Sequence, residues 1–284
     1  MKKITALSLA LFVFAGIKAQ SLLWEITGKG IKKSYLYGTI HIQDKRVFAF
    51  DKLVEEKLME CDAYAMELVI DEITREDLEA SMYMKDKTLK DLLSPEDYSM
   101  LDSILKAKMG VGLVMLNKMK PFFVSSQLMQ AGMSKDMEEA LDMYFLNKAR
   151  AAGKPVFGIE KFSDQMGAID QISLEEQCEM LMESVRDTSK EEMQFDDLLH
   201  AYLTANLDTM IVLSNDTALP EQFNKAFLVD RNVGMAKNII KICKKQSTFN
   251  AIGAAHLGGD KGVIALLRKK GLVLKPVPFS FRDE

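Results

Sequence analysis

The chain has 284 residues, of which 48% are hydrophobic and 27% charged, with 37 Lys and Arg against 41 Asp and Glu. This length and apolar content predict a folded domain with a sizeable core, and exclude a disordered, collagen-like or coiled-coil chain. The formal net charge of −4, without a basic block, argues against nucleic-acid binding, and three His with three Cys exclude a Cys-rich zinc module.

The first nineteen residues are predicted to be a secretory signal peptide. Lys2 and Lys3 form a positive start, residues 6–17 are apolar, and Ala19 offers a small residue for cleavage. The apolar run is short for a bilayer span, and a short N-terminal anchor is the alternative. Removing residues 1–19 takes away three Lys and no acid, so the net charge becomes −7. We expect an exported protein, periplasmic or secreted, with no stable membrane span after cleavage.

The N-terminal part of the mature chain reads as strands. Residues 22–28 and 34–42 alternate between apolar and polar side chains, and the glycines in the linker between them favour a hairpin. Helical spacing of apolar residues follows over 50–61, and "AYAMELV" (63–69) predicts a short buried strand.

The middle of the chain is predicted to be mainly helical from Asp71 onward. Helix starts are marked by Ser94 followed by Pro95, and by Ser173 with Glu176 as a capping box. One strand, "KPVFGIE" (154–160), interrupts the helices.

The C-terminal part returns to strands. We expect strands at 248–256 and 272–278 with a helix at 262–270 between them. The predicted fold class is α+β: a central sheet formed from N- and C-terminal segments, with a large mainly helical middle insertion, as one domain over residues 20–284. The cysteines are interpreted as buried free thiols, with one disulfide as the alternative: Cys61, Cys178 and Cys243.

Two of the three histidines end matching motifs. Gly38-Thr39-Ile40-His41 and Gly253-Ala254-Ala255-His256 each close a predicted strand, at opposite ends of the chain. A sheet built from both ends could bring the two imidazoles together, and glycine permits a close approach of backbone or ligand. Two imidazoles with one carboxylate are a typical donor set of catalytic zinc sites. His200 lies in a helical pattern and is interpreted as a surface or packing residue.

Charged residues at strand ends could complete a site. Glu67 stands among apolar residues in "YAMELV", so its charge would need a partner if that strand is internal. Glu160 is placed similarly at the end of "PVFGIE", and each glutamate could instead be a surface residue. Arg231 in "VDRN" could hold an anion or pair with Asp230 at the surface.

Several segments together resemble the TraB/GumN family, which includes the Tiki metalloproteases. They run in order over Leu22 to Val277: "LLWEITG…SYLYGTIHI", "AMEL", "GKPVFGIEKFSDQ", "DRN" and "NAIGAAHLGGDKGVIALLRKKGLVLKPV". The resemblance implies a site of His41, His256 and an acidic residue, which is Glu67 by its place in "MEL". It also implies divalent-metal dependence, with Mn or Co supporting activity in Tiki members.

The leading hypothesis is a divalent-metal-dependent hydrolase, a peptidase acting on a peptide or small amide. His41 and His256 would bind the metal, which could be Mn, Co or Zn. Glu67 would be either the third ligand or the base, and Glu160 is the better base if Glu67 is a ligand. Arg231 could stabilise an oxyanion or hold a substrate carboxylate. The alternatives are a metal-independent hydrolase of the erythromycin-esterase-like type and a non-catalytic, haem-like ligand-binding protein.

Overall fold

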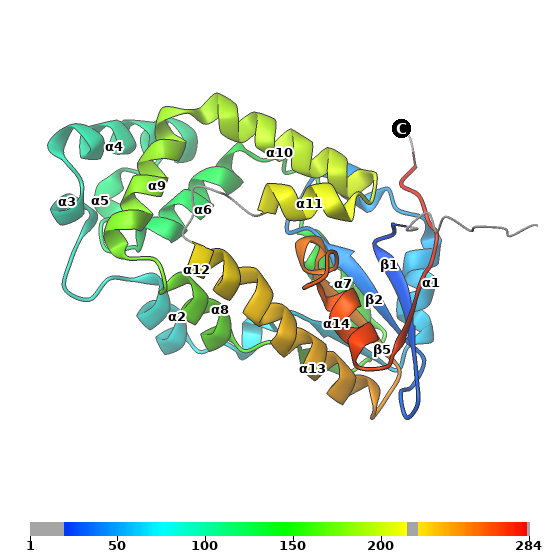
Figure 1. Ribbon diagram of the computed structural model, residues 1–284. Coiled ribbons are helices and arrows are strands. Elements are labelled where there is room, and N and C mark those ends of the chain that lie inside the picture. The colour runs from blue at the N-terminus through cyan, green and yellow to red at the C-terminus, as the bar shows by residue number, and fades with distance from the viewer. Residues whose placement is uncertain (1–19, 215–220, 283–284) are drawn as a thin grey trace, which may run out of the picture.

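The computed structural model describes residues 20–214 and 221–282, apart from the side chains of residues 188–192 and 222. Its centre is a six-stranded sheet in the order β4-β3-β5-β2-β1-β6 (Figure 1). The strands are β1 (Leu23–Thr27), β2 (Ser34–Thr39), β3 (Ala63–Met66), β4 (Val156–Gly158), β5 (Thr248–Gly253) and β6 (Val273–Pro276). Strands from both ends of the chain therefore build one sheet, as the sequence predicts.

Four neighbouring strands of the sheet are parallel, and the pairs at the other end of the strand order are antiparallel. Strands β4, β3, β5 and β2 run parallel, whereas β1 pairs antiparallel with both β2 and β6. All residues of β2 and β3 are buried, which is the pattern of strands covered on both faces. Helix α7 (Leu141–Ala151) packs against β3, while α13 (Arg231–Cys243) and α14 (Val263–Lys269) lie in front of the sheet in Figure 1.

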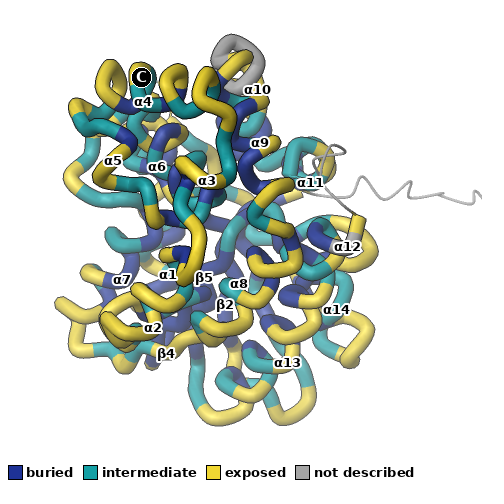
Figure 2. The backbone as a smooth tube through the Cα atoms, turned by 90° about the vertical axis from the view of Figure 1, so that its left-hand side faces the viewer, coloured by how far each residue is buried: buried dark blue, intermediate teal, exposed yellow. Residues whose placement is uncertain are grey.

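The helical middle forms a second apolar cluster. Leu101, Leu105 and Leu181 are fully buried in this cluster, which is separate from the larger apolar cluster around the sheet. Figure 2 shows residues coloured as buried in both regions. Its helices are α2 (Arg75–Met82), α3 (Leu89–Leu92), α4 (Pro95–Met109), α5 (Leu113–Leu116), α6 (Pro121–Gly132) and α9 (Leu174–Arg186). The remaining helices are α1 (Lys52–Glu60), α8 (Phe162–Ile169), α10 (Thr188–Leu203), α11 (Leu207–Ser214) and α12 (Glu221–Asn224).

Local sequence signals set the predicted boundaries. Ser94 caps α4 ahead of Pro95, and Ser173 with Glu176 forms the capping box of α9. A positive φ of 84° at Gly271 follows α14, a conformation that glycine adopts without strain. The three cysteines are free and buried, which confirms the thiol interpretation.

Several strands end earlier than their sequence patterns predict. β2 stops at Thr39, β3 at Met66 and β5 at Gly253, and a 3₁₀ turn (Ala254–His256) follows β5. His41, Glu67 and His256 therefore stand just beyond the strand ends rather than on the strands.

Two sequence predictions lie beyond what the structure tests. The signal peptide at residues 1–19 falls outside the described residues, and the single domain over 20–284 stays a prediction. Within the described residues, no helix combines the length and apolar character that crossing a bilayer requires.

Candidate functional site

The parallel pairing of β2 with β5 brings the two Gly-x-x-His motifs together. Thr39 pairs with Gly253 in the last register position of the two strands. Because the carboxyl ends of parallel strands meet at one sheet edge, the segments that follow them lie side by side. The motifs are 215 residues apart between His41 and His256, and they meet only through the fold.

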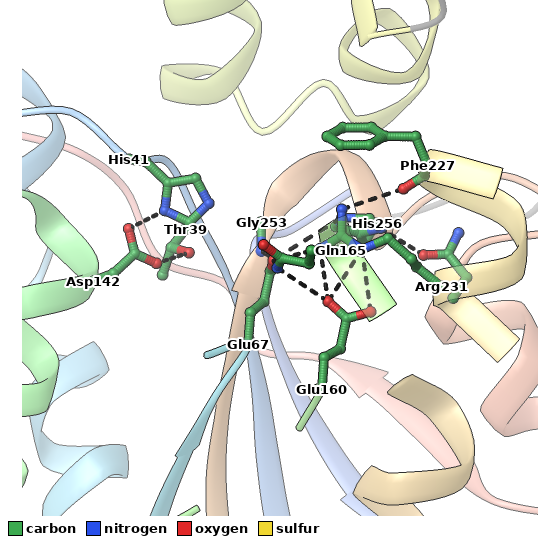
Figure 3. Close-up of polar contacts among 11 residues, drawn as sticks. Thr39, His41, Glu67, Asp142, Glu160, Gln165, Phe227, Arg231, Gly253 and His256 are labelled. Atoms are coloured by element: carbon green, nitrogen blue, oxygen red, sulfur yellow. Dashed lines mark hydrogen bonds and ion pairs between the residues drawn. The ribbon is translucent and has the colours of Figure 1, made fainter. Parts of the chain in front are cut away.

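The two motif glycines make room for different things. A Cβ on Gly38 would lie 2.6 Å from Leu257 Cδ1, so this glycine lets the turn after β5 pack onto β2. A Cβ on Gly253 would lie 3.1 Å from Glu67 Oε1, 3.5 Å from His256 Cδ2 and 3.8 Å from His41 Nε2. The two imidazoles and one carboxylate therefore surround the open face of Gly253 (Figure 3).

Glu67 is a buried carboxylate that accepts hydrogen bonds at both oxygens. Oε1 accepts a hydrogen bond from Gly253 N at 2.5 Å, and Oε2 accepts from Arg231 Nη2 at 2.8 Å. Burial works to raise its pKa, but His256, His41, Arg231 and the Gly253 N–H outweigh burial and hold the pKa of Glu67 at about 2. Its side chain is 10% exposed, so the sequence prediction of a buried charge with a partner is confirmed.

Arg231 joins Glu67 to Glu160. Its guanidinium donates to both Glu160 oxygens, with Nη2 at 2.6 Å from Oε2, and Nη1 donates to the Phe227 carbonyl at 3.2 Å. Phe227 belongs to a π-helical segment (Lys225–Asp230) that leads into α13, and such segments often shape functional sites. Arg231 is 7% exposed, and Asp230 bonds to Lys225 instead, so the surface-pair alternative is wrong.

The side chain of Glu160 is buried. It is 4% exposed, which excludes the surface alternative. Burial raises the pKa of Glu160 more than Arg231 and Gln165 lower it. Gln165 Nε2 donates to Oε2 of both Glu67 and Glu160, at 3.3 Å each. A pocket of about 300 Å³ between α8 and α13 is lined by Glu160 and Arg231.

His256 is held in one tautomer by an amide. Asn232 Nδ2 donates to Lys261 O at 3.0 Å, so Asn232 Oδ1 is the atom that accepts from His256 Nδ1 at 2.7 Å. The ring's Nε2 is then free and lies 3.9 Å from Glu67 Oε1. Burial lowers the pKa of His256 to about 4, so the ring is neutral at pH 7.

His41 is held by a carboxylate instead. Its Nδ1 lies 2.6 Å from Asp142 Oδ2, and Thr39 Oγ1 donates to Asp142 Oδ1 at 2.5 Å. The charge of Asp142 is the main cause that raises the pKa of His41 to about 9. The His41 side chain is 64% exposed, in contrast to 6% for His256.

The fold thus gathers five of the residues predicted from the sequence at one sheet edge: His41, Glu67, Glu160, Arg231 and His256. His200 lies exposed on α10, as predicted.

Sequence reasoning missed Asp142, Gln165 and Asn232. Asn232 was within reach, because it completes the "DRN" segment beside Arg231. Asp142 carries no such signal, since it is one of many acidic residues in the helical middle of the chain and belongs to none of the recognised motifs.

The donor set fits a divalent metal in its chemistry. Each imidazole uses Nδ1 on an oxygen acceptor and leaves Nε2 facing the site, the arrangement usual for metal-binding histidines. Over residues 20–214 and 221–282, no three His, Cys, Asp or Glu side chains are grouped closely enough to hold a metal ion. Glu67 Oε1 is turned onto Gly253 N in this arrangement, at 3.9 Å from the His256 nitrogen.

Comparisons with known proteins agree with these features. The model of the TraB/PrgY/gumN family matches residues 22–276. "Metalloprotease TIKI1" of Danio rerio is 24% identical over an aligned length of 316, and the match covers 91% of this chain and 63% of that protein. "Metalloprotease TIKI2" of Xenopus tropicalis is 24% identical over an aligned length of 315, and that match covers 91% of this chain and 60% of that protein. The chain thus spans about three fifths of the length of these relatives. No solved structure matches it significantly.

Proposed function

The chain belongs to the TraB/PrgY/gumN family, and on that premise we propose that it is an exported, divalent-metal-dependent hydrolase, a peptidase that cleaves a peptide or a small amide. One observation carries the proposal: two imidazole rings and a carboxylate surround the open face of Gly253. The names of the distant relatives, both metalloproteases, support the same reaction class. Residues 1–19 support export.

In this proposal three residues hold the metal. His41 and His256 bind through Nε2, because their Nδ1 atoms are engaged by Asp142 and Asn232. Glu67 supplies the third donor through Oε1. A bound Mn²⁺, Co²⁺ or Zn²⁺ would supply Lewis-acid activation of water and of the scissile carbonyl.

The two glutamates suit different tasks. The pKa of Glu67 is held at about 2, so it stays ionised as a ligand must. Burial raises the pKa of Glu160 instead, which makes it the better proton acceptor near neutral pH. We therefore assign Glu160 to take the proton of the attacking water at a carboxylate oxygen and to return it to the leaving amine as the C–N bond breaks.

Arg231 keeps the two carboxylates together. Four of its five N–H groups are used on Glu67, Glu160 and the Phe227 carbonyl. One Nη1 N–H remains to meet a developing oxyanion or a substrate carboxylate. Its first task is to hold Glu67 ionised and directed toward the histidines.

A second candidate is hydrolysis without metal. The 2.6 Å contact between His41 and Asp142 is a carboxylate–imidazole pair that favours the protonated ring, with the pKa of His41 raised to about 9. In that mechanism Glu160 would take the proton of the attacking water, and the protonated His41 would donate a proton to the leaving amine as the C–N bond breaks. Activity that survives exhaustive chelation would favour this candidate.

The test uses the mature chain, residues 20–284, with a mixed peptide library as substrate. We expect metal content near one equivalent and hydrolysis that chelation abolishes and Mn²⁺, Co²⁺ or Zn²⁺ restores. His41→Ala and His256→Ala should lose both metal and activity. His200→Ala, a change at an exposed histidine on α10, is the matched control and should lose neither. Full activity in both site variants would end the proposal. Fractionation of cells that express residues 1–284 checks the proposed export.

A further inference from the structure

One buried acid from the helical insertion reaches into the sheet edge. Asp142 stands in the first turn of α7, and its side chain is 11% exposed. Thr39 occupies one of its oxygens at 2.5 Å and His41 the other at 2.6 Å. Both partners belong to the first Gly-x-x-His motif, so the Asp142 carboxylate forms hydrogen bonds with two residues of that motif.

The backbone around Asp142 is tied to the same segment. Leu141 N donates to the Ile42 carbonyl at 3.2 Å, one residue beyond His41. Tyr64 on β3 donates its hydroxyl to the Asp142 carbonyl at 3.5 Å. The carboxylate is therefore fixed relative to the sheet and can act as a rigid anchor.

His41 depends on this anchor more than His256 depends on Asn232. The His256 side chain is 6% exposed, so packing holds its ring as well as the amide. The His41 side chain is 64% exposed, and Asp142 makes the one hydrogen bond that its ring forms within the described part of the chain. Loss of Asp142 would free the ring to rotate and to exchange tautomers.

We propose that Asp142 is the positioning residue of His41: it holds the proton on Nδ1 and turns Nε2 toward the open face of Gly253. For metal binding, this inference rests on the proposed function above. Carboxylates that accept from the second nitrogen of a ligating histidine fix its orientation and raise its basicity as a ligand. The helical insertion would thereby complete the site instead of only covering it.

The first test is calorimetric titration of the metal-free mature chain with Mn²⁺ and with Zn²⁺. Asp142→Ala should raise the Kd by about 10- to 100-fold, the usual cost of losing such a partner. Asp142→Asn should fall between Asp142→Ala and wild type, because its amide oxygen can still accept from Nδ1. Asp136→Asn removes the same charge from an exposed position on the preceding loop and should leave the Kd unchanged. An unchanged Kd in a folded Asp142→Ala variant would overturn the proposal.

A second variant guards against loss of folding in Asp142→Ala. Thr39→Val removes the other contact of Asp142 and leaves His41 untouched. It should weaken metal binding by less than Asp142→Ala does. A Kd for Thr39→Val equal to that of wild type, together with a wild-type Kd in Asp142→Asn, would contradict the anchoring role.

A measurement without metal separates this inference from the proposed function. In nitrogen-labelled metal-free protein, the Nδ1 proton of His41 should give a downfield, slowly exchanging resonance, because it donates to a carboxylate. The resonance should persist in Asp136→Asn and vanish in Asp142→Ala. Its absence from wild type would overturn the positioning role. If it behaves as expected while no form of the chain binds Mn²⁺ or Zn²⁺, Asp142 still positions His41 and the metal-dependent function is wrong.

Discussion

Substitution of Gly253 by Ala would place a methyl group in the middle of the proposed donor set. The new carbon would lie 3.1 Å from Glu67 Oε1, 3.5 Å from the His256 ring and 3.8 Å from His41 Nε2. A divalent metal sits about 2.0–2.2 Å from nitrogen and oxygen ligands. The methyl group would therefore compete for the space that a shared ion needs.

The fold should tolerate this change. Gly253 has φ −53° and ψ 134°, angles that Ala adopts without strain. Replacing Gly by Ala at such a position stabilises proteins by about 0.4–1 kcal/mol through the unfolded chain. The 3.1 Å contact with Glu67 requires a shift of a few tenths of an ångström, which offsets that gain. We expect the free energy of unfolding to change by less than about 1 kcal/mol. Loss of a residue that supports a metal ligand usually lowers metal affinity about 10- to 100-fold, and we expect the Gly253→Ala change to lower it by at least as much.

Thermal unfolding, calorimetric Mn²⁺ titration and peptide hydrolysis measure the two effects separately. Gly167→Ala is the matched control, because Gly167 lies in α8 and a Cβ there would meet nothing within 4 Å. This control should gain up to about 1 kcal/mol of stability from helix propensity and keep its metal affinity. A Gly253→Ala protein that is folded, binds Mn²⁺ with the wild-type Kd and hydrolyses peptide normally would refute the shared site.

Three further outcomes follow from the charges in the structure. Glu67→Gln should abolish Mn²⁺ binding. Glu160→Gln should leave the Kd for Mn²⁺ unchanged and lower kcat by about 10²–10⁴-fold, which is the usual contribution of a proton-transfer residue. If calorimetric titration and kinetics show the opposite pattern, the roles of the two glutamates are reversed. Arg231→Met leaves two carboxylates buried without their cation and should lower the urea-derived free energy of unfolding by about 3–5 kcal/mol; a loss under 1 kcal/mol would show that the network adds little to folding. Asp44 is 2% exposed, and its hydrogen bond from the Arg46 side chain lowers its pKa below the ordinary value. A lowered folded-state pKa gives stability that is complete above the unfolded pKa of about 3.9 and is lost as pH falls through the folded pKa. The stability difference between wild type and Asp44→Asn should therefore hold at pH 7 and shrink below about pH 4, and a difference independent of pH would contradict the pairing.

The sequence predicts the part of the site that depends on strands. Alternating and apolar runs at both chain ends identify the strands, and a Gly-x-x-His at the end of two of them indicates that the two imidazoles could come together. The parallel pairing of Thr39 with Gly253 places both motifs at one edge of the sheet. The buried position of Glu67 was also predictable, because it stands among apolar residues in a short central strand.

The contacts that helical residues make with the site could not be predicted from the sequence in the same way. Asp142 is 101 residues from His41, and its reach depends on how α7 packs on the sheet, which no local pattern encodes. Arg231 illustrates a second difficulty. The sequence offers Asp230 as its neighbour, yet the π-helical turn before α13 directs the guanidinium inward to Glu67 and Glu160. The strand boundaries also differ from the prediction, because β2 and β5 end before their histidines, which lie in the segments just beyond the strand ends.

The most direct test of the shared site is the position of a bound ion. Crystals of the mature chain soaked in Mn²⁺ and measured for anomalous scattering would locate it without reference to any substrate. The account predicts one strong peak bonded to His41 Nε2, His256 Nε2 and Glu67 Oε1. A peak at other residues, or fully occupied Mn²⁺ elsewhere with these three side chains unchanged, would contradict it.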